Sequence, residues 1–264
     1  MGRLWAVYLR ELKSFFVSPL AYVVIGAFSA ITGYSFWNQI QDYQVAMLRF
    51  YQAQQFYGAQ AGDLLEQLNI NRMIIQPTFG GMGFFLLLFA PFISIKLIAE
   101  EKKSKTIELL ITSPIKLYEI ILGKYSAVLT VFFVMLALSF VFPFFIILYG
   151  APDMAPIFSA YLGISLLGAS FLAWGFFASS ITQSPIVAGV ISYAGLFAFW
   201  LIEWTGRFLG EPWNDIVSYL SIISHWLNMI TGLIDTRDIV YYVSFIFMCL
   251  FFVYRVLRSQ SWRT

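Results

Sequence analysis

The segment 95–124 reads IKLIAEEKKSKTIELLITSPIKLYEIILGK and separates two long apolar stretches of the chain. It holds six lysines and four glutamates, which is ten of the thirty charged residues in the protein. Within it, Ile107, Leu110 and Ile111 fall on one face of a short helix. A charged, helix-forming segment with its own apolar stripe, held between two membrane helices, predicts a docking surface for a soluble protein on the cytoplasmic side.

The composition indicates why the neighbouring stretches are membrane spans. Hydrophobic residues make up 60% of the chain and charged residues only 11%, against roughly 25% charged residues in soluble domains. A helix needs about 20 mostly apolar residues to cross the hydrocarbon core of a bilayer. The sequence therefore predicts a single-domain, all-α polytopic membrane protein. Its six expected spans are 20–37, 73–95, 125–149, 157–181, 186–202 and 239–256.

The distribution of basic residues predicts the orientation of these spans. Six crossings place both termini on one side, and with that side in the cytoplasm 12 of the 16 basic residues lie inside. The opposite orientation would reverse this bias, contrary to the positive-inside rule. We therefore expect a multi-pass protein of the inner (plasma) membrane with both termini cytoplasmic, and with 99–118 as a cytoplasmic segment.

Two further segments have an amphipathic or mixed character. Residues 1–18 mix aromatic and aliphatic side chains with Arg3, Arg10 and Lys13, which favours an interfacial helix; ordinary positive flanking of a first span explains the pattern about as well. The segment 38–72 has low charge and many glutamines, which favours a packed helical hairpin or cap outside the membrane over a substrate-contacting loop.

A seventh apolar segment, 216–234, carries no formal charge but has a polar stripe at three- and four-residue steps. A seventh crossing would export the basic C-terminus. We therefore expect an outer re-entrant or interfacial element, whose polar face must meet protein or water. The residues of this outer polar stripe are Ser218, Ser221, His225 and Asn228.

Groups for catalysis or metal binding are scarce. Cys249 is the only cysteine and His225 the only histidine, which excludes a Cys or His metal cluster within one chain. Residues 123–126, GKYS, match the end of a P-loop, but Tyr118 stands where the first glycine is required. Formal charges are also missing near the middle of the expected spans, which disfavours an ion-coupled carrier. We expect no enzyme activity, no metal and no cofactor bound by this chain.

Glycines recur inside the expected spans at 80, 81, 83, 163, 168 and 175. Small residues let membrane helices approach closely. As a group they fit either packing within one chain or a seam between two copies.

Residues 100–115, EEKKSKTIELLITSPI, resemble the loop between the second and third spans of ABC-2 type transporter permeases. In that family the loop reads as paired acids, basic residues, Gly-Thr, an apolar residue, Glu, a Leu pair and Thr-Ser-Pro; here Lys105 occupies the usual glycine position. The resemblance implies a coupling helix inserted into a cleft of a separate ATPase subunit, which would hold ATP and Mg. The implied coupling residues are Glu100, Glu101, Thr106, Ile107, Glu108, Leu110, Ile111, Thr112, Ser113 and Pro114.

A second stretch, 224–242, resembles the outer segment and last span of gliding-motility-associated and copper-enzyme-maturation permeases, although a proline common near the Ser-His position is absent. The two resemblances imply a permease subunit of an ATP-driven exporter that pairs with an ABC ATPase dimer and a second permease copy or paralogue. Membrane lipid is expected as a further partner and nucleic acid is not. An ATPase-independent channel or carrier, or a membrane scaffold that uses the same loop for docking, remains the alternative.

Overall fold

A computed structural model of the chain describes residues 2–57, 68–107, 115–150, 152–206, 210, 217 and 219–260. These residues contain no β-strand, and six of their helices are long and apolar enough to cross a membrane. The all-α class and the six spans predicted from the sequence are confirmed. The helices are α1 (Arg3–Val17), α2 (Pro19–Tyr57), α4 (Gln76–Ser94), α5 (Ala99–Lys103), α7 (Leu117–Ser139), α8 (Val141–Tyr149), α9 (Met154–Ile181), α10 (Pro185–Gly206), α12 (Ile222–Ile230) and α13 (Thr236–Gln260).

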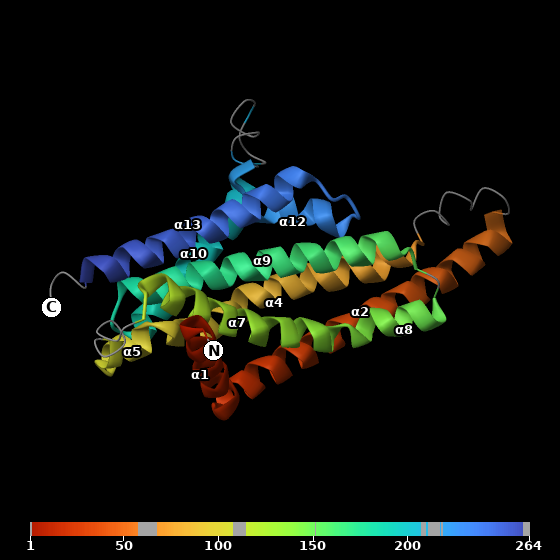
Figure 1. Cartoon of the computed structure of the whole chain (residues 1–264). Coiled ribbons are helices and arrows are strands. Elements are labelled where there is room, and N and C mark those ends of the chain that lie inside the picture. Colours follow the sequence, from red (N-terminus) through yellow and green to blue (C-terminus); the bar gives the residue numbers. More distant parts are fainter. Residues whose placement is uncertain are drawn as a thin grey trace.

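The long helices form a bundle whose end near α5 also carries the last turns of α13 (Figure 1). Two short turns complete the second span: a π-helical turn at Asn71–Ile75 leads into α4, and a 3-10 turn at Ile95–Leu97 joins α4 to α5. We call the end of the bundle that carries α5 the α5 end. The α5 end is the part of the fold that positions the candidate site.

Helix α9 lies at the centre of the bundle and packs against α4, α7, α10, α12 and α13. Its glycines permit this close packing. A Cβ atom on Gly168 would lie 2.1 Å from Cζ of Phe132 in α7, and one on Gly163 would lie 2.8 Å from Cβ of Met229 in α12. These two glycines therefore serve packing within the chain and do not form a seam between copies.

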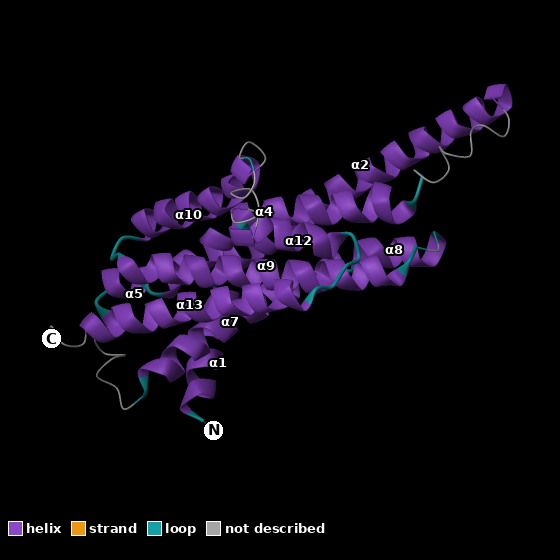
Figure 2. Cartoon of the chain, turned by 90° about the horizontal axis from the view of Figure 1, so that it is seen from above, coloured by secondary structure: helices purple, strands orange, loops and turns teal. Residues whose placement is uncertain are grey.

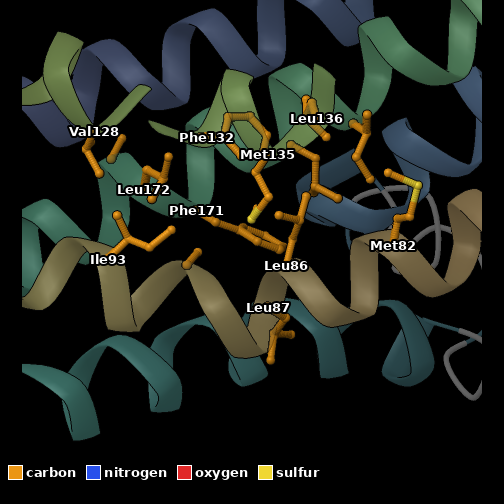
Figure 3. Packing of buried hydrophobic residues seen from close by; sticks show 14 of the residues in the cluster. Met82, Leu86, Leu87, Ile93, Val128, Phe132, Met135, Leu136, Phe171 and Leu172 are labelled. Carbon is orange, nitrogen blue, oxygen red and sulfur yellow. The ribbon is translucent and has the colours of Figure 1, made fainter. Parts of the chain in front are cut away.

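Side chains from α4, α7 and α9 meet in the main hydrophobic core. Figure 3 shows Leu86 of α4, Met135 of α7 and Phe171 of α9 converging on one another, while Leu87 points to the opposite side of α4. All four are at most 1% exposed. Because the side chains of the three helices interlock, the core has little room for an added atom.

Helix α2 is longer than the span predicted for it. The sequence places the end of the first span at residue 37, whereas α2 continues unbroken to Tyr57. No glycine or proline occurs in 34–57 to interrupt it. Its 39 residues correspond to about 58 Å at 1.5 Å per residue, roughly twice the hydrocarbon thickness. Figure 2 shows its far end projecting beyond the neighbouring helices.

The third span is interrupted shortly before Pro143. The break between α7 and α8 falls at Phe140. Proline has no N–H with which to bond the carbonyl four residues earlier, that of Ser139, and its ring crowds that carbonyl. The helical break therefore precedes the proline by one turn.

Candidate functional site

The predicted coupling segment begins with α5 at the α5 end of the bundle. Glu100 and Glu101 lie in its first turn, and Thr106 and Ile107 follow it in a short helical turn. Ile107 is buried, whereas Glu100 and Thr106 are exposed. The remaining predicted coupling residues lie outside the described residues: Glu108, Leu110, Ile111, Thr112, Ser113 and Pro114.

Lys105, at the usual glycine position of the resembling loop, has a φ of 58°. This left-handed conformation explains why glycine suits the position, because a side chain there costs roughly 1–2 kcal/mol. The turn is retained: the N–H of Lys105 donates to the carbonyl of Lys102 at 3.2 Å. The replacement of glycine by lysine has therefore not removed the turn that ends α5.

We expect Lys105→Val to lower the free energy of unfolding by roughly 1–2 kcal/mol, because a β-branched side chain fits poorly at positive φ. Lys105→Gly should stay within about 0.5 kcal/mol of the unmodified protein, since relief of the strain offsets the greater freedom of glycine when unfolded. Thermal unfolding in detergent measures both, with Lys103→Val as a helical, exposed control. Equal losses in the two valine variants would contradict the strained turn.

A group of four charged residues, which we call the charged clasp, joins three helices at the α5 end. The Nζ of Lys124 in α7 lies 3.0 Å from Oε1 of Glu11 in α1 and 2.9 Å from Oε1 of Glu101 in α5. The Nη2 of Arg10 donates to the same oxygen of Glu101 at 3.1 Å. The side chain of Lys124 is only 1% exposed. The clasp therefore fixes α1 and α5 to the start of the third span.

Close packing of α1 on α7 brings these charges together. A Cβ atom on Gly123 would lie 2.9 Å from Cγ1 of Val7, so the glycine allows α1 to lie directly against α7. The hydroxyls of Tyr8 and Thr130 share a hydrogen bond of 3.1 Å. Helix α1 thus has an inward face held by the bundle, in addition to exposed apolar side chains such as Trp5 and Val17.

Helix α9 holds α5 from the other side. The Oγ of Ser179 accepts hydrogen bonds from the N–H groups of Ile98 at 3.0 Å and Ala99 at 2.9 Å, and so caps the start of α5. Such donors have no partner within the helix itself. The buried ammonium of Lys102 donates to the carbonyl of Ser180. The start of the coupling segment is therefore fixed to α1, α7 and α9 together.

These contacts include residues that the sequence did not single out: Glu11, Lys102, Lys124 and Ser179. From the sequence, Lys124 is one of the basic residues of a cytoplasmic loop and part of the rejected P-loop match, and Glu101 is expected to face the partner. The structure places Glu101 against Lys124 and Arg10. A lysine among Ile120, Ile121 and Val128 is a signal for burial, since charge in an apolar helix face needs a partner.

The residues of the predicted outer polar stripe do not form one surface. Ser221 caps α12, its Oγ accepting from the N–H groups of Ile223 and Ser224. His225 is buried, its Nδ1 lying 2.6 Å from Oδ1 of Asp238 and its Nε2 donating to the carbonyl of Tyr219 at 2.9 Å. Asn228 is exposed, and Ser218 lies outside the described residues.

The contacts of His225 join α12 to the start of α13. Its ring also stacks on Tyr241, with centroids 4.2 Å apart. Helix α12 packs directly against α4 through Trp226. A Cβ atom on Gly83 of α4 would lie 2.2 Å from that ring. The described residues contain no group of three or more His, Cys, Asp or Glu that could hold a metal ion. The arrangement is one that locks two helices together.

Two comparisons with known proteins bear on these observations. Residues 5–257 match the model of a protein family described as ABC-2 family transporter protein. The match covers α5, nearly all of α1 and, apart from the last residues of α13, all six membrane helices. A search of curated proteins found no matching sequence.

Proposed function

The chain belongs to the ABC-2 family of transporter proteins, the membrane subunits of ABC transporters, and we propose that a separate ATPase drives it through the segment 99–118. ATP and Mg would be held by that ATPase. The observation that carries this proposal is the fixation of α5 to three helices at once, by the charged clasp and by Ser179 and Lys102.

A loop transmits the motion of a partner only if it is attached firmly to elements that move. Glu101 links α5 to α1 and α7, and the bonds of Ser179 and Lys102 link it to α9. Displacement of α5 would then shift these helices as a body, in the manner of rigid-body switches between packed states. A loop that served only as a basic flank of a channel would need no such attachment.

We also propose a division of roles among the coupling residues. Glu101 faces the bundle and attaches α5 to it, whereas Glu100 and Thr106 are exposed and available to a partner. We assign partner contact to Thr106 and to 108–114, and positioning to Glu101. We propose that the complete transporter contains a second permease copy or a paralogue and that it exports its substrate. The protein would lie in the inner membrane with both termini in the cytoplasm.

The test is purification of the tagged protein in mild detergent, with mass spectrometry of the proteins that co-elute. We expect a P-loop ATPase with the unmodified protein and at least a tenfold lower yield of it with Glu108→Lys, because charge reversal at a docking surface opposes association. Asp42→Lys is the matched control: it reverses an exposed acid in the part of α2 expected on the opposite side of the membrane.

Recovery of the unmodified protein without any ATPase would contradict the proposal and favour an independent channel or carrier. Recovery of a non-ATPase protein that Glu108→Lys releases would favour a scaffold. An equal loss of ATPase with Asp42→Lys would show that charge reversal acts through general damage, and would remove the assignment of docking to the coupling segment.

A further inference from the structure

A cavity of about 310 Å³ opens at the α5 end between α1, the start of α2, the 3-10 turn after α4 and α5. Its volume is at the lower end of the roughly 300–1,000 Å³ found for small-molecule sites. The charged clasp forms its back wall. The lining residues outside the clasp take no part in the attachment of α5 described above.

The charges that line the cavity fall into two groups. The four clasp residues carry two positive and two negative charges and are paired with one another. Lys96 and Glu100 also line the cavity, and neither forms an ion pair with any residue that the structure describes. Both have accessible surface. The cavity thus offers one cation and one carboxylate, held apart, for a ligand.

Hydroxyl and apolar groups complete the lining. Ser14 of α1 and Ser18, which follows α1, line the cavity, and within the described part of the chain their hydroxyls have no hydrogen-bond partner. Phe15, Leu20 and Leu97 supply an apolar side. A ligand that fits must therefore combine charged and hydroxyl-bonding groups with an apolar portion.

The cavity lies beside a helix whose composition suits the headgroup layer of a membrane. Helix α1 combines charged residues on its clasp side with exposed Trp5 and Val17, a pattern typical of helices that lie at the boundary between headgroups and acyl chains. The cavity lies beside this helix and is lined by Lys96 and Leu97 of the 3-10 turn, where the apolar run of α4 ends. Phospholipid headgroups are the ligands present at that depth.

We propose that this cavity binds a phospholipid whose headgroup carries both a phosphate and a primary ammonium, as in phosphatidylethanolamine. Lys96, Ser14 and Ser18 donate to the phosphate, and Glu100 accepts from the ammonium; such charge-assisted bonds are the stronger ones. The choline headgroup has no N–H to donate, and a glycerol headgroup has no cation. The equal numbers of positive and negative lining charges disfavour inorganic phosphate or a nucleotide.

The test uses native mass spectrometry of the full chain, delipidated in detergent and titrated with phosphatidylethanolamine, phosphatidylcholine or phosphatidylglycerol of the same acyl chains. We expect phosphatidylethanolamine to bind about tenfold more tightly than the other two. Lys96→Gln and Glu100→Gln should each remove most of this preference, whereas Lys103→Gln, an exposed change outside the cavity, should keep it. Neither cavity substitution breaks an ion pair, so the fold should be retained.

Equal binding of the three lipids, or a preference for phosphatidylglycerol, would overturn the proposal. Retention of the preference in both glutamine variants would overturn the assignment to this cavity. Soluble glycerophosphoethanolamine serves as the remaining probe: if it displaced the lipid at equal concentration, the ligand would be a soluble compound and the assignment to lipid would fail. None of these measurements involves the ATPase, so their outcome is independent of the proposed coupling.

Discussion

Replacing Lys124 with methionine should lower the free energy of unfolding by about 3–5 kcal/mol. The ammonium of Lys124 is 1% exposed and lies within 3.0 Å of both Glu11 and Glu101. Methionine fills a similar volume but leaves the two carboxylates of Glu11 and Glu101 with only the exposed Arg10 as a cation. Removal of a buried partner is costly because the desolvated charges that remain lose their closest compensation. Thermal unfolding in detergent, followed by size-exclusion chromatography, provides the measurement.

A triple variant distinguishes charge imbalance from loss of shape. Lys124→Met combined with Glu11→Gln and Glu101→Gln removes the charges together, and neutral replacement of a buried ion-pair group is often close to neutral in stability. We expect the triple variant to recover at least half of the loss. Lys103→Met, at an exposed position of α5, should change stability by less than about 0.5 kcal/mol. A triple variant as unstable as the single one would contradict the role of the clasp.

The triple variant also tests the proposed coupling. In the triple variant α5 keeps its bonds to α9 through Ser179 and Lys102 but loses its link to α1 and α7. If the clasp transmits motion as proposed, this variant should bind the ATPase normally and transport less per ATP hydrolysed. A folded triple variant with unchanged coupling would confine the clasp to stability.

The spans could be predicted because each is a continuous apolar run, and length and hydrophobicity are local properties of the sequence. The break near Pro143 is likewise local, since proline acts on the carbonyl four residues before it. The length of α2 was missed for a different reason. The thickness of the bilayer sets the minimum length of an apolar run that crosses it, but it does not set how far the helix continues beyond that run.

The clasp could not be predicted because it depends on tertiary packing. Glu11, Glu101 and Lys124 are far apart in the sequence, and they meet only because α1 folds back onto α7 over Gly123. The sequence shows each charge but not its partner. The same holds for Ser179, whose capping of α5 requires the end of α9 to lie beside it. Contacts of this kind decide which side of the coupling segment faces inward.

The glycines within the membrane spans also show what a sequence pattern cannot decide. Their sequence spacing fits packing within one chain as well as a seam between two copies. The structure separates these possibilities position by position. A Cβ atom on Gly168 would meet Phe132 of the same chain, whereas one on Gly80 would have nothing within 4 Å. Two glycines of one predicted group are therefore in opposite environments.

That difference predicts opposite effects of the same substitution. Gly168→Ala should lower the free energy of unfolding by about 1–3 kcal/mol, because the new methyl group would lie 2.1 Å from Cζ of Phe132, whose ring is 1% exposed and packed in the core. Gly80→Ala should raise it by roughly 0.5–1 kcal/mol, because alanine is the better helix former and the site is open. Thermal unfolding of the two variants in the same detergent measures both.

A compensating change identifies the cause. Phe132→Leu in the Gly168→Ala background removes the ring atoms that the methyl group meets, and should restore part of the lost stability, while Phe132→Leu alone should destabilise by loss of core packing. A double variant whose loss equals the sum of the two single losses would show that Gly168 is not required for the approach of α7. Non-additivity of the expected sign would instead place the close contact of α7 and α9 among the determinants of the fold.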